Sequence, residues 1–518
     1  MRKPAAGAAQ EGIVTVMHRS GGIQPHLWVL VLVQGVVSAA SLVVEILAGR
    51  MLAPHVGMSL YTWTSVIAIV LAGFSLGHWW GGRIANRPIE EALRITGWTL
   101  IGAALTTAAA AWLLRLAAGP VLGTVEHPIW AIVVLCSAVF FLPSLFAGVP
   151  APVLAQVAVV RSERSGEALG AMFAAGAVGA IAGTLLAGFL FISWLGTAAT
   201  LAVVTAVYVL AALVCFALSR RVTARLGAAL VVIGAGLTGL PLLAPPQCDH
   251  ESDYFCIRTV DLSADPARPV HLMVLDHLAH GIGARDVPQV MFTEHAAMLL
   301  ELSKRRAPSP EATSYFIGGG SYSVPRALAD AGFGEITVSE IDPMVTEIAE
   351  RDFWLDRSEM VIFHEDARRA LLSRPERRYD LIVGDAFTDV AVPAHLITRE
   401  FMQLVAGRLT PEGSYLMNVI DYEGRLRALA SMVATAREVF PHVEVWTRTD
   451  RPPPGERAVF VLVAGRAPGG QGGFVVPAPE PVRFAALPQE ALARLAETRG
   501  QILTDDFAPI DRLMGRMD

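Results

Sequence analysis

YFIGGGSYSVPRALADA, residues 315–331, is the stretch that decides the fold of the second half of this chain. A short apolar run ends in three consecutive glycines, Gly318, Gly319 and Gly320, and a segment with helical spacing of apolar residues follows. Further apolar runs of strand length lie at residues 335–340, 360–363, 379–383 and 414–419. Strands that alternate with helices predict a parallel, doubly wound α/β sheet.

The strand ends of this predicted sheet carry groups that suit a nucleotide. Glu340 ends the second strand, where a carboxylate can accept both hydroxyls of a ribose. Asp366 follows the third strand, placed to reach an adenine amino group, and Asp385 ends the fourth. In doubly wound sheets the ligand lies beyond the carboxyl ends of the strands. The glycines alone are a weak sign, whereas the four strand ends together predict a nucleotide site.

The first half of the chain has a different composition. Of 518 residues, 53% are hydrophobic and 17% are charged, but residues 1–246 hold only 13 basic and 7 acidic side chains and no aspartate. The remaining residues hold 28 basic and 40 acidic side chains, so the halves carry net charges of +6 and −12. This distribution excludes a coiled coil, a disordered chain and a nucleic-acid binder with a basic face.

Seven apolar segments of the first half are long enough to cross a membrane, since a spanning helix needs about 20 apolar residues. They lie at residues 27–48, 61–82, 95–118, 129–149, 168–193, 196–218 and 226–245. The sequence thus predicts a multi-pass α-helical membrane bundle of about seven spans over residues 26–246, preceded by an N-terminal tail, 1–25. The first segment is too long for a cleaved signal peptide.

Basic residues in the connecting loops predict the orientation of this bundle. The tail and the even-numbered loops hold eleven Lys and Arg residues, whereas the odd-numbered loops hold only Arg50 and Arg115. By the positive-inside rule the N-terminus is cytoplasmic, in a cell (inner) membrane, and the second half faces the other side. A second span within residues 129–161 would reverse this, so the side is left open, with the charge bias favouring an extracytoplasmic position.

Two features inside the predicted bundle have alternative interpretations. Gly179 and Gly183 form a GxxxG pattern, which lets another helix approach closely, and we expect a packing role. Glu45 lies near the end of the first span. A structural salt bridge, or a carboxylate that reaches the interface, is favoured there over transport or proton relay.

Residues 247–300 connect the two halves. Extended runs at 255–262 and 270–275 predict a small β-hairpin layer, followed by a connecting helix. Cys248 and Cys256 are spaced for a disulfide if this side of the membrane is oxidising, and two free thiols are the alternative.

The rest of the second half divides into two predicted parts. The α/β domain is expected over residues 301–465, where runs at 443–446 and 459–463 finish the sheet as an edge hairpin. A C-terminal extension over 466–518 begins with a Gly/Pro-rich surface linker, 466–480. Three histidines lack a clear ligand spacing, so packing is favoured over a metal site for His277, His280 and His295.

Four motifs of the α/β domain resemble the core of spermidine synthases. They are residues 315–331 quoted above, ITVSEIDPMVTEIA at 336–349, HEDARRAL at 364–371 and YDLIVGDAF at 379–387. Upstream, ESDY at 251–254, Leu275-Asp276 and FTEHAAML at 292–299 resemble that family's β-layer and the start of its core. The resemblance implies a Rossmann-like fold of the class I methyltransferase/spermidine synthase type.

The first half adds a second resemblance. RMLAPHVGMS at 50–59 and LAGFSLGHWWGGR at 71–83, together with TDDFAP at 504–509, resemble fused proteins that join a transporter-like membrane bundle to a spermidine synthase-like domain. The two resemblances together cover residues from about 40 to 510 and imply a membrane-anchored transferase.

The resemblance also implies residue roles. S-adenosylmethionine or its decarboxylated form would be the co-substrate, an aminopropyl group would pass to a small amine, and no metal is expected. Glu340 would bind the ribose, Asp366 the adenine, and catalytic Asp385 would accept a proton from the attacking amine. The three glycines would complete the cofactor site. The acceptor side would be formed by Tyr254, Asp276, His280, Glu294, Ser321 and Asp389. The lipid bilayer is the other expected partner, and a homodimer is left open.

Several positions depart from the pattern of true spermidine synthases. Ser321 stands where an aspartate helps to hold the amine, His280 stands where a glutamine is usual, and Asp389 is only the nearest substitute for a second acidic residue. Because a buried diamine dication needs several carboxylates, these changes weaken the case for putrescine more than that for nucleotide binding. Methyl transfer from the same site, and a polyamine or nucleoside transporter or sensor without chemistry, are the alternatives.

Overall fold

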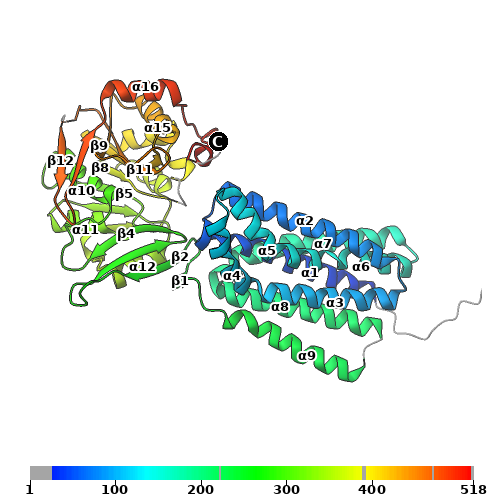
Figure 1. Cartoon of the computed structure of the whole chain (residues 1–518). Coiled ribbons are helices and arrows are strands. Elements are labelled where there is room, and N and C mark those ends of the chain that lie inside the picture. Colours follow the sequence, from blue (N-terminus) through cyan, green and yellow to red (C-terminus); the bar gives the residue numbers. More distant parts are fainter. Residues whose placement is uncertain (1–25, 221–222, 388–391, 470–471, 515–518) are drawn as a thin grey trace, which may run out of the picture.

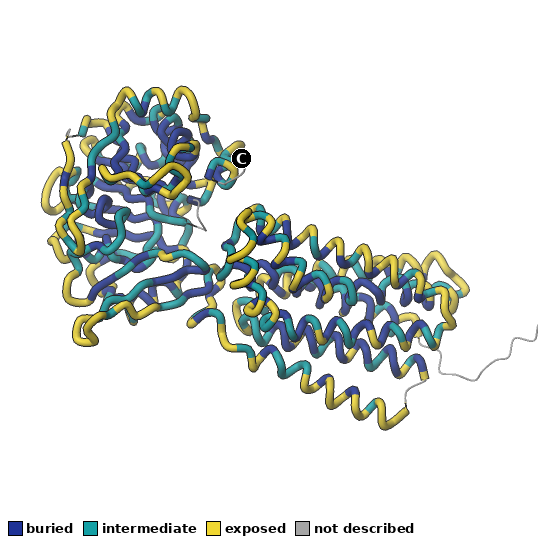
Figure 2. Tube along the Cα trace, viewed as in Figure 1, coloured by how far each residue is buried: buried dark blue, intermediate teal, exposed yellow. Residues whose placement is uncertain are grey.

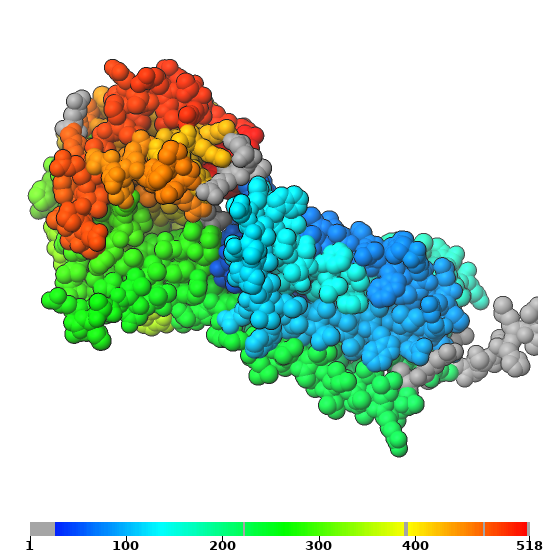
Figure 3. Space-filling view, viewed as in Figure 1, coloured from blue at the N-terminus to red at the C-terminus, as the bar shows by residue number. Residues whose placement is uncertain are grey.

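The computed structural model describes residues 26–220, 223–387, 392–469 and 472–514. Two parts are distinct in Figure 1: an elongated bundle of helices from the first half of the chain, and an α/β domain from the second half. The α/β domain lies against one end of the bundle, and the space-filling view in Figure 3 shows the two surfaces in contact there. The predicted tail, residues 1–25, lies outside the described residues.

The bundle consists of apolar helices, most of which overlap the predicted segments, whereas the segment 95–118 is divided between two helices and residues 150–161 form a helix that was not predicted. The α-helices are α1 (Leu27–Val56), α2 (Leu60–Ala85), α3 (Ile89–Ala108), α4 (Ala110–Thr124), α5 (Pro128–Gly148), α6 (Pro150–Arg161), α7 (Ser165–Leu186), α8 (Ile192–Ser219) and α9 (Ala224–Gly239). Short π and 3-10 turns follow α7 and α9, at Ala187–Phe191 and Leu240–Leu243. Five helical runs within the described ranges are long and apolar enough to cross a membrane, or up to six if the α3–α4 pair, bent by 54°, is one span. The expected count of about seven therefore stays a prediction.

The crossing of α1 and α7 shows why glycine is needed in the bundle interior. A Cβ atom on Gly179 would lie 2.0 Å from the carbonyl oxygen of Gly35, and one on Gly183 would lie 2.2 Å from that of Ala39. These distances are far inside van der Waals contact, so both positions need the absence of a side chain. The predicted packing role of this GxxxG pair is confirmed. In Figure 2 the inward faces of the helices are buried, and their outward faces are exposed.

A small antiparallel sheet connects the bundle to the main domain. Its strands pair in the order β1 (His250–Glu251), β2 (Cys256–Asp261), β3 (Val270–Leu275) and β4 (Leu278–Ala284), and helix α10 (Glu294–Arg306) follows. The predicted hairpin is thus part of a four-stranded layer. Cys248 and Cys256 are joined by a disulfide, with their Cα atoms 5.2 Å apart, which confirms the pairing expected from their spacing.

The main sheet has the predicted doubly wound topology. Its nine strands pair in the order β12-β13-β10-β11-β9-β8-β5-β6-β7, and the pairs from β9 to β7 are parallel. The parallel strands are β5 (Ser314–Ile317), β6 (Ile336–Ser339), β7 (Val361–Phe363), β8 (Tyr379–Gly384) and β9 (Leu409–Tyr422). The strand order reverses between β5 and β8, and a crevice forms at such a switch point.

Helices cover both faces of this sheet, as Rossmann-like folds require. They are α11 (Ser323–Asp330), α12 (Pro343–Asp352), α13 (Ala367–Ser373), α14 (Arg399–Arg408), α15 (Arg427–Arg437), α16 (Gln489–Arg499) and α17 (Ile510–Met514), with 3-10 turns at Arg357–Glu359 and Ala394–Leu396. The helices predicted after the first and second strands are confirmed as α11 and α12.

Two expectations about the end of the chain were wrong. Strands β10 (His442–Arg448) and β11 (Arg457–Gly465) do pair antiparallel, but they are not the edge of the sheet. The sheet continues beyond them through β13 (Val482–Ala486) to β12 (Gly473–Val476). The stretch 466–480, expected to be a linker, therefore contains a strand of the sheet. Its glycines and prolines masked a short run of strand-forming residues, Phe474 to Val476.

The tight α1–α7 crossing predicts the effect of adding one methyl group. Gly183→Ala would force the helix backbones apart, and we expect it to lower the free energy of unfolding by about 1–3 kcal/mol, the usual cost of overpacking. Gly170→Ala is the matched control on the same helix, because a Cβ atom there would have no neighbour within 4 Å. Thermal unfolding of the detergent-purified variants measures both. Equal melting temperatures would contradict the packing role.

Candidate active site

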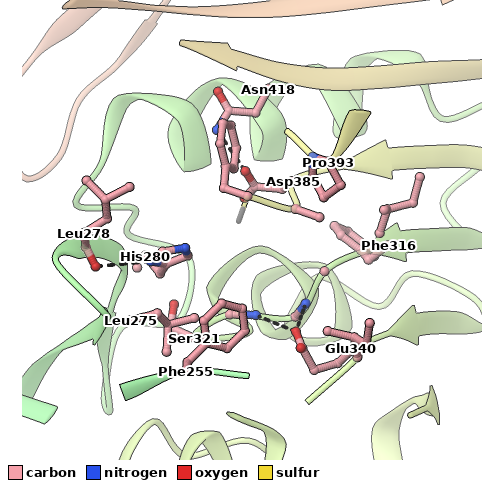
Figure 4. A pocket seen from close by; sticks show the side chains of 18 of the residues that line it. Phe255, Leu275, Leu278, His280, Phe316, Ser321, Glu340, Asp385, Pro393 and Asn418 are labelled. Carbon is pink, nitrogen blue, oxygen red and sulfur yellow. Dashed lines mark hydrogen bonds between the residues drawn. The ribbon is translucent and has the colours of Figure 1, made fainter. Parts of the chain in front are cut away.

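A cavity of about 600 Å³ lies where the carboxyl ends of β5, β6 and β8 meet the small sheet and the end of the bundle. Its volume is within the range that binds small molecules and nucleotides. Ten of the twelve predicted site residues line it: Tyr254, Asp276, His280, Gly318, Gly319, Gly320, Ser321, Glu340, Asp366 and Asp385. Figure 4 shows the central part of this wall.

The glycine turn and Glu340 form one end of the cavity. Gly318 has a φ of 94°, and a Cβ atom there would lie 2.8 Å from the carbonyl oxygen of Asp385, so only glycine fits. Glu340 Oε2 accepts hydrogen bonds from the backbone N–H groups of Gly319 (2.8 Å) and Gly320 (3.4 Å), as Figure 4 shows. Burial raises the pKa of Glu340, and these N–H groups oppose the rise. The carboxylate is therefore held in a fixed orientation at the edge of the turn.

Asp366 lies at the start of α13. Its Oδ1 atom accepts a hydrogen bond from the backbone N–H of Arg369 at 2.9 Å and caps the helix. Its Oδ2 atom lies 2.7 Å from Nε2 of His395. His395 also lines the cavity, and sequence reasoning missed it because it belongs to a short 3-10 turn that no periodic pattern marks.

Asp385 lies at the end of β8, near the centre of the cavity. Its backbone N–H donates to the carbonyl oxygen of Ile317 at 3.0 Å. This bond joins the ends of β8 and β5, the two strands between which the strand order reverses. Its Oδ1 atom accepts a hydrogen bond from the Nδ2 atom of Asn418 at 2.8 Å. Asn418, on β9, is a cavity residue that sequence reasoning missed. The available signal was one amide inside the apolar run YLMNVI, residues 415–420.

The turn between β3 and β4 brings two predicted residues to the opposite wall. Asp276 adopts a φ of 54° in this turn, and its Oδ1 atom accepts a hydrogen bond from the backbone N–H of Cys256 at 3.0 Å. Burial raises the pKa of Asp276. His280 lies on β4 with Nδ1 3.1 Å from the carbonyl oxygen of Leu278, and burial lowers its pKa.

The other predicted acceptor residues differ in their surroundings. Tyr254 lies at the rim of the cavity with 45% of its surface exposed. Ser321 is buried, and its Oγ atom lies 2.7 Å from Oγ of Ser323. Asp389 lies outside the described residues.

The placement of Glu294 on the acceptor side was wrong. Its side chain forms an ion pair with Arg448 at 2.6 Å and does not line the cavity, whereas Thr293 and His295 on either side of it do. Neighbouring residues at the start of a helix point in different directions, so the alignment of the motif identified the segment but not the inward-facing positions.

The bundle forms part of the cavity wall, which sequence reasoning also missed. Arg50 at the end of α1, Met58 in the turn that follows, and Trp63 on α2 line the same cavity as Glu340. The guanidinium of Arg50 donates to the backbone carbonyl oxygen of Ser252 at 2.6 Å. The sequence places this site in the second half of the chain, but residues of the first half complete its wall.

Arg50 begins a chain of hydrogen bonds that ends at Glu340. The hydroxyl of Ser252, whose carbonyl oxygen Arg50 binds, donates to the carboxylate of Asp342. The backbone N–H of Asp342 in turn donates to Oε1 of Glu340 at 3.0 Å. These bonds connect Arg50 to Glu340 through the positions of Ser252 and Asp342, in addition to the glycine-turn N–H groups that hold the other oxygen of Glu340.

The cavity offers carboxylates, an amide and imidazoles rather than a metal centre. No group of three or more His, Cys, Asp or Glu side chains in the described ranges is arranged to hold a metal ion. Backbone N–H groups at the glycine turn, the carboxylate of Glu340 and that of Asp366 form a polar edge. Hydroxyl and amino groups of a nucleoside are the ligand chemistry that this edge fits.

The hydrogen-bond chain predicts that a bundle residue controls nucleotide binding. Arg50→Gln removes the donor to Ser252, and we expect the purified protein to bind an adenosyl nucleotide, measured calorimetrically, roughly tenfold more weakly, as for a lost charged hydrogen bond. Arg115→Gln is the matched control, because Arg115 also donates to a backbone carbonyl at this junction, that of Pro246 at 2.7 Å, but has no link to Glu340. Equal losses in both variants would show that only the junction matters.

Parts of the chain are similar to known proteins. No family model matches the chain. A polyamine aminopropyltransferase from Vibrio vulnificus is 36% identical over 118 residues, which are 22% of this chain and 39% of the relative. An N-terminal histidine N-methyltransferase from Emericella nidulans is 31% identical over 176 residues, 32% of this chain and 31% of the relative. The chain thus spans less than half the length of the curated relatives it matches, between 23% and 44%.

The probable spermidine synthase from Corynebacterium glutamicum is 19% identical, and the match covers 51% of this chain and 99% of that one with a TM-score of 0.43. The second half of this chain is similar to spermidine synthases and methyltransferases. The resemblance of the bundle to membrane-fused relatives stays a prediction.

Proposed function

We propose that this protein is a membrane-anchored transferase of the spermidine synthase type. The observation that carries the proposal is the arrangement of Glu340, Asp366 and Asp385 at the ends of neighbouring strands around one cavity. S-adenosylmethionine or its decarboxylated form would be the donor, and a small amine the acceptor. The similarity to an aminopropyltransferase supports the reaction class.

The residues around the cavity suit this donor. We assign Glu340 to the ribose hydroxyls and Asp366 to the adenine, with the backbone of the glycine turn against the nucleoside. A sulfonium donor supplies a carbon that is already electrophilic. The chain's own residues then have to position the acceptor amine and hold its proton, and positioning supplies most of the rate enhancement.

Asp385 is the residue that we assign to the acceptor amine. Its carboxylate belongs to the same cavity as Glu340 and His280 (Figure 4), and the hydrogen bond from Asn418 fixes its orientation. An amine is a nucleophile only after it has lost a proton, and a carboxylate both holds the ammonium ion and stabilises proton transfer from it. The position of Asp385 therefore fits the catalytic role that the resemblance implies.

Methyl transfer from S-adenosylmethionine is the second candidate. Ser321 is buried against Ser323 and offers no charge for a diamine, and one relative is an N-methyltransferase. Identifying the transferred group by mass spectrometry separates the two reactions.

The reaction predicts different effects for two substitutions. In an assay of the purified protein with labelled donors and a panel of amines, Asp385→Asn should lower kcat about 10²–10⁴-fold, because the proton-holding group is lost. Glu340→Gln should mainly raise the KM of the donor. If no amine yields a product and Asp385→Asn changes nothing, the transferase proposal is wrong, and a transporter or sensor becomes the better account.

The outer surface of the bundle supports the membrane anchor. Phe189 and Trp194 are 78% and 80% exposed and face outward among other apolar side chains, a surface that lipid tolerates and water does not. Seven passes follow if the bent α3–α4 pair is one span and the run Ser165–Ser219 counts as two. A straight helix of its 55 residues would be about 80 Å long, more than twice the thickness of the hydrocarbon core.

Gly196 is where we propose that this run turns back. It has a φ of 72° within an otherwise helical stretch, so the helix is broken there. The next residue, Thr197, donates through its backbone N–H and its hydroxyl to Glu251 of the small sheet, both at 2.8 Å. The break therefore lies at the end of the bundle that meets the α/β domain, as a turn between two membrane passes would.

Seven passes and the basic-residue bias together favour an extracytoplasmic α/β domain, and the Cys248–Cys256 disulfide agrees with an oxidising side. We expect alkaline phosphatase fused after residue 518 to be active in cells, and green fluorescent protein at the same position to stay dark. The opposite pattern would place the domain in the cytoplasm and contradict the proposed topology. A fusion after Asn86, at the end of α2, controls for reporter function because it should give that opposite pattern.

A further inference from the structure

Two arginines line the cavity without a carboxylate partner: Arg50 near the end of α1 and Arg457 at the start of β11. Arg50 donates to the backbone carbonyl oxygens of Ser252 at 2.6 Å and Phe255 at 3.4 Å. The Nε atom of Arg457 donates to the hydroxyl of Tyr422 at 3.4 Å. Neither guanidinium forms an ion pair with another residue that the structure describes. Guanidinium groups that lack a fixed counter-ion in a cavity suit a ligand with an anionic group.

Both guanidinium groups lie near the turn between β3 and β4, on the acceptor side of the cavity. Burial raises the pKa of Asp276 in this turn, and the positive charge of Arg50 opposes the rise. Burial also lowers the pKa of the neighbouring His277 to about 4, and the charge of Arg457 adds to that effect. One turn is thus within electrostatic range of both arginines, so a single anion beside it can interact with both.

The same cavity has carboxylates for positively charged groups. Of those that the described residues place on its wall, four are engaged by backbone N–H groups or by basic side chains: Glu340, Asp276, Glu365 and Asp366. Among the described residues, Asp385 accepts through Oδ1 alone, from Asn418, and the carboxylate of Asp253 at the exposed rim has no partner. A cavity with available carboxylates and guanidinium groups fits an acceptor that carries charges of both signs.

The wall of the cavity reaches helices that are apolar enough to cross a membrane, at the end of the bundle that meets the α/β domain (Figure 1). Arg50 belongs to α1, six residues or about 9 Å before its last residue, Val56. Trp63 belongs to the first turn of α2. Met58 lines the cavity between the two helices, and the nearby Leu60 is 64% exposed. In a membrane-spanning bundle, a guanidinium this close to a helix end lies at the depth of the lipid headgroups.

We propose that the acceptor is the phosphoethanolamine headgroup of a membrane phospholipid. Its primary ammonium group lies at Asp385, Arg50 and Arg457 bind its phosphate, and its acyl chains remain in the bilayer. This inference rests on the proposed transfer function and specifies the acceptor. It also gives the bundle a role in the reaction, because the bundle holds the cavity at the depth where this acceptor is found.

The proposed step transfers one carbon group and releases one proton. The ammonium group of the lipid gives a proton to the carboxylate of Asp385, and the freed electron pair of the nitrogen forms a bond to the carbon beside the sulfonium. The carbon–sulfur bond breaks, and its electron pair stays on sulfur as a thioether. The product is a secondary ammonium ion on the same lipid, and the proton on Asp385 is released to water.

A vesicle assay tests the acceptor. The full-length protein is reconstituted in phosphatidylcholine vesicles with and without phosphatidylethanolamine, and label from S-adenosylmethionine or its decarboxylated form is measured in the lipid extract. We expect the label in phosphatidylethanolamine. Soluble glycerophosphoethanolamine has the same headgroup without acyl chains, and its initial rate at equal concentration should be at least about tenfold lower, because the bilayer concentrates the lipid beside the cavity.

Three other outcomes contradict different parts of the proposal. Equal rates with the soluble headgroup would overturn the lipid as its source. If only amines without a phosphate are modified, the acceptor proposal is wrong and the transfer function stands. If no amine is modified, although calorimetry shows that the donor binds, the transfer function itself is wrong.

Variants of Arg457 test the phosphate contact. Arg457→Gln should raise the KM for phosphatidylethanolamine about tenfold and leave the KM of the donor unchanged, because a charged contact to the phosphate is lost. Arg457→Lys keeps the charge and should restore part of the affinity. Arg451→Gln is the matched control and should change neither KM. Both guanidinium groups pack on an aromatic ring, at 5.8 Å for Arg451 and 5.6 Å for Arg457, but Arg451 pairs with Glu423 and is not among the described residues that line the cavity. A rise only in the KM of S-adenosylmethionine, whose carboxylate could use the same guanidinium, would overturn the phosphate contact.

Discussion

The hydrogen bond from Arg50 to the carbonyl oxygen of Ser252 is the interaction on which the rest of the site depends. It joins the first helix of the bundle to the β1–β2 turn, and through Ser252 and Asp342 it orients Glu340. Other contacts also join the bundle to the small sheet, such as the bonds from Thr197 to Glu251, but the Arg50 bond lies at the wall of the cavity. With it, the cavity has a wall that the α/β domain cannot supply alone. A soluble fragment that lacks the bundle would therefore have a more open site with a less constrained Glu340.

Much of the α/β domain could be predicted from sequence because its signals are local. Each parallel strand is a short apolar run, and the functional residue follows within a few positions, as at Glu340 and Asp385. The same locality explains why ten of the twelve predicted site residues line one cavity. Asn418 and Arg50 escaped this reasoning for opposite reasons. Asn418 is inside a strand, where a single polar residue interrupts the apolar pattern without marking a site. Arg50 belongs to a helix that is 202 positions before its partner Ser252 in the sequence.

The sequence predicted that the first half forms a bundle of apolar helices better than it predicted the bounds of those helices. Apolar length identified most of the helices, but α6 lies outside the predicted segments, and α3 and α4 were predicted as one. The proposed number of passes also rests on Gly196, one residue whose backbone conformation leaves no trace in composition. The two arginines that ran against the orientation count also have a structural explanation. Arg50 and Arg115 donate to backbone carbonyl oxygens of Ser252 and Pro246 at the junction, so their positions are set by the neighbouring domain. These two arginines therefore do not count against the orientation that the Lys and Arg residues of the other loops favour.

The disulfide between Cys248 and Cys256 has a mechanical consequence. The chain leaves the last helix of the bundle near Leu243 and enters β1 at His250, with two prolines and Cys248 in between. Because Cys248 is bonded to the first residue of β2, only the few residues between Leu243 and Cys248 are left as an unrestrained connection. The α/β domain joined by so short a connection has little freedom to move away from the end of the bundle.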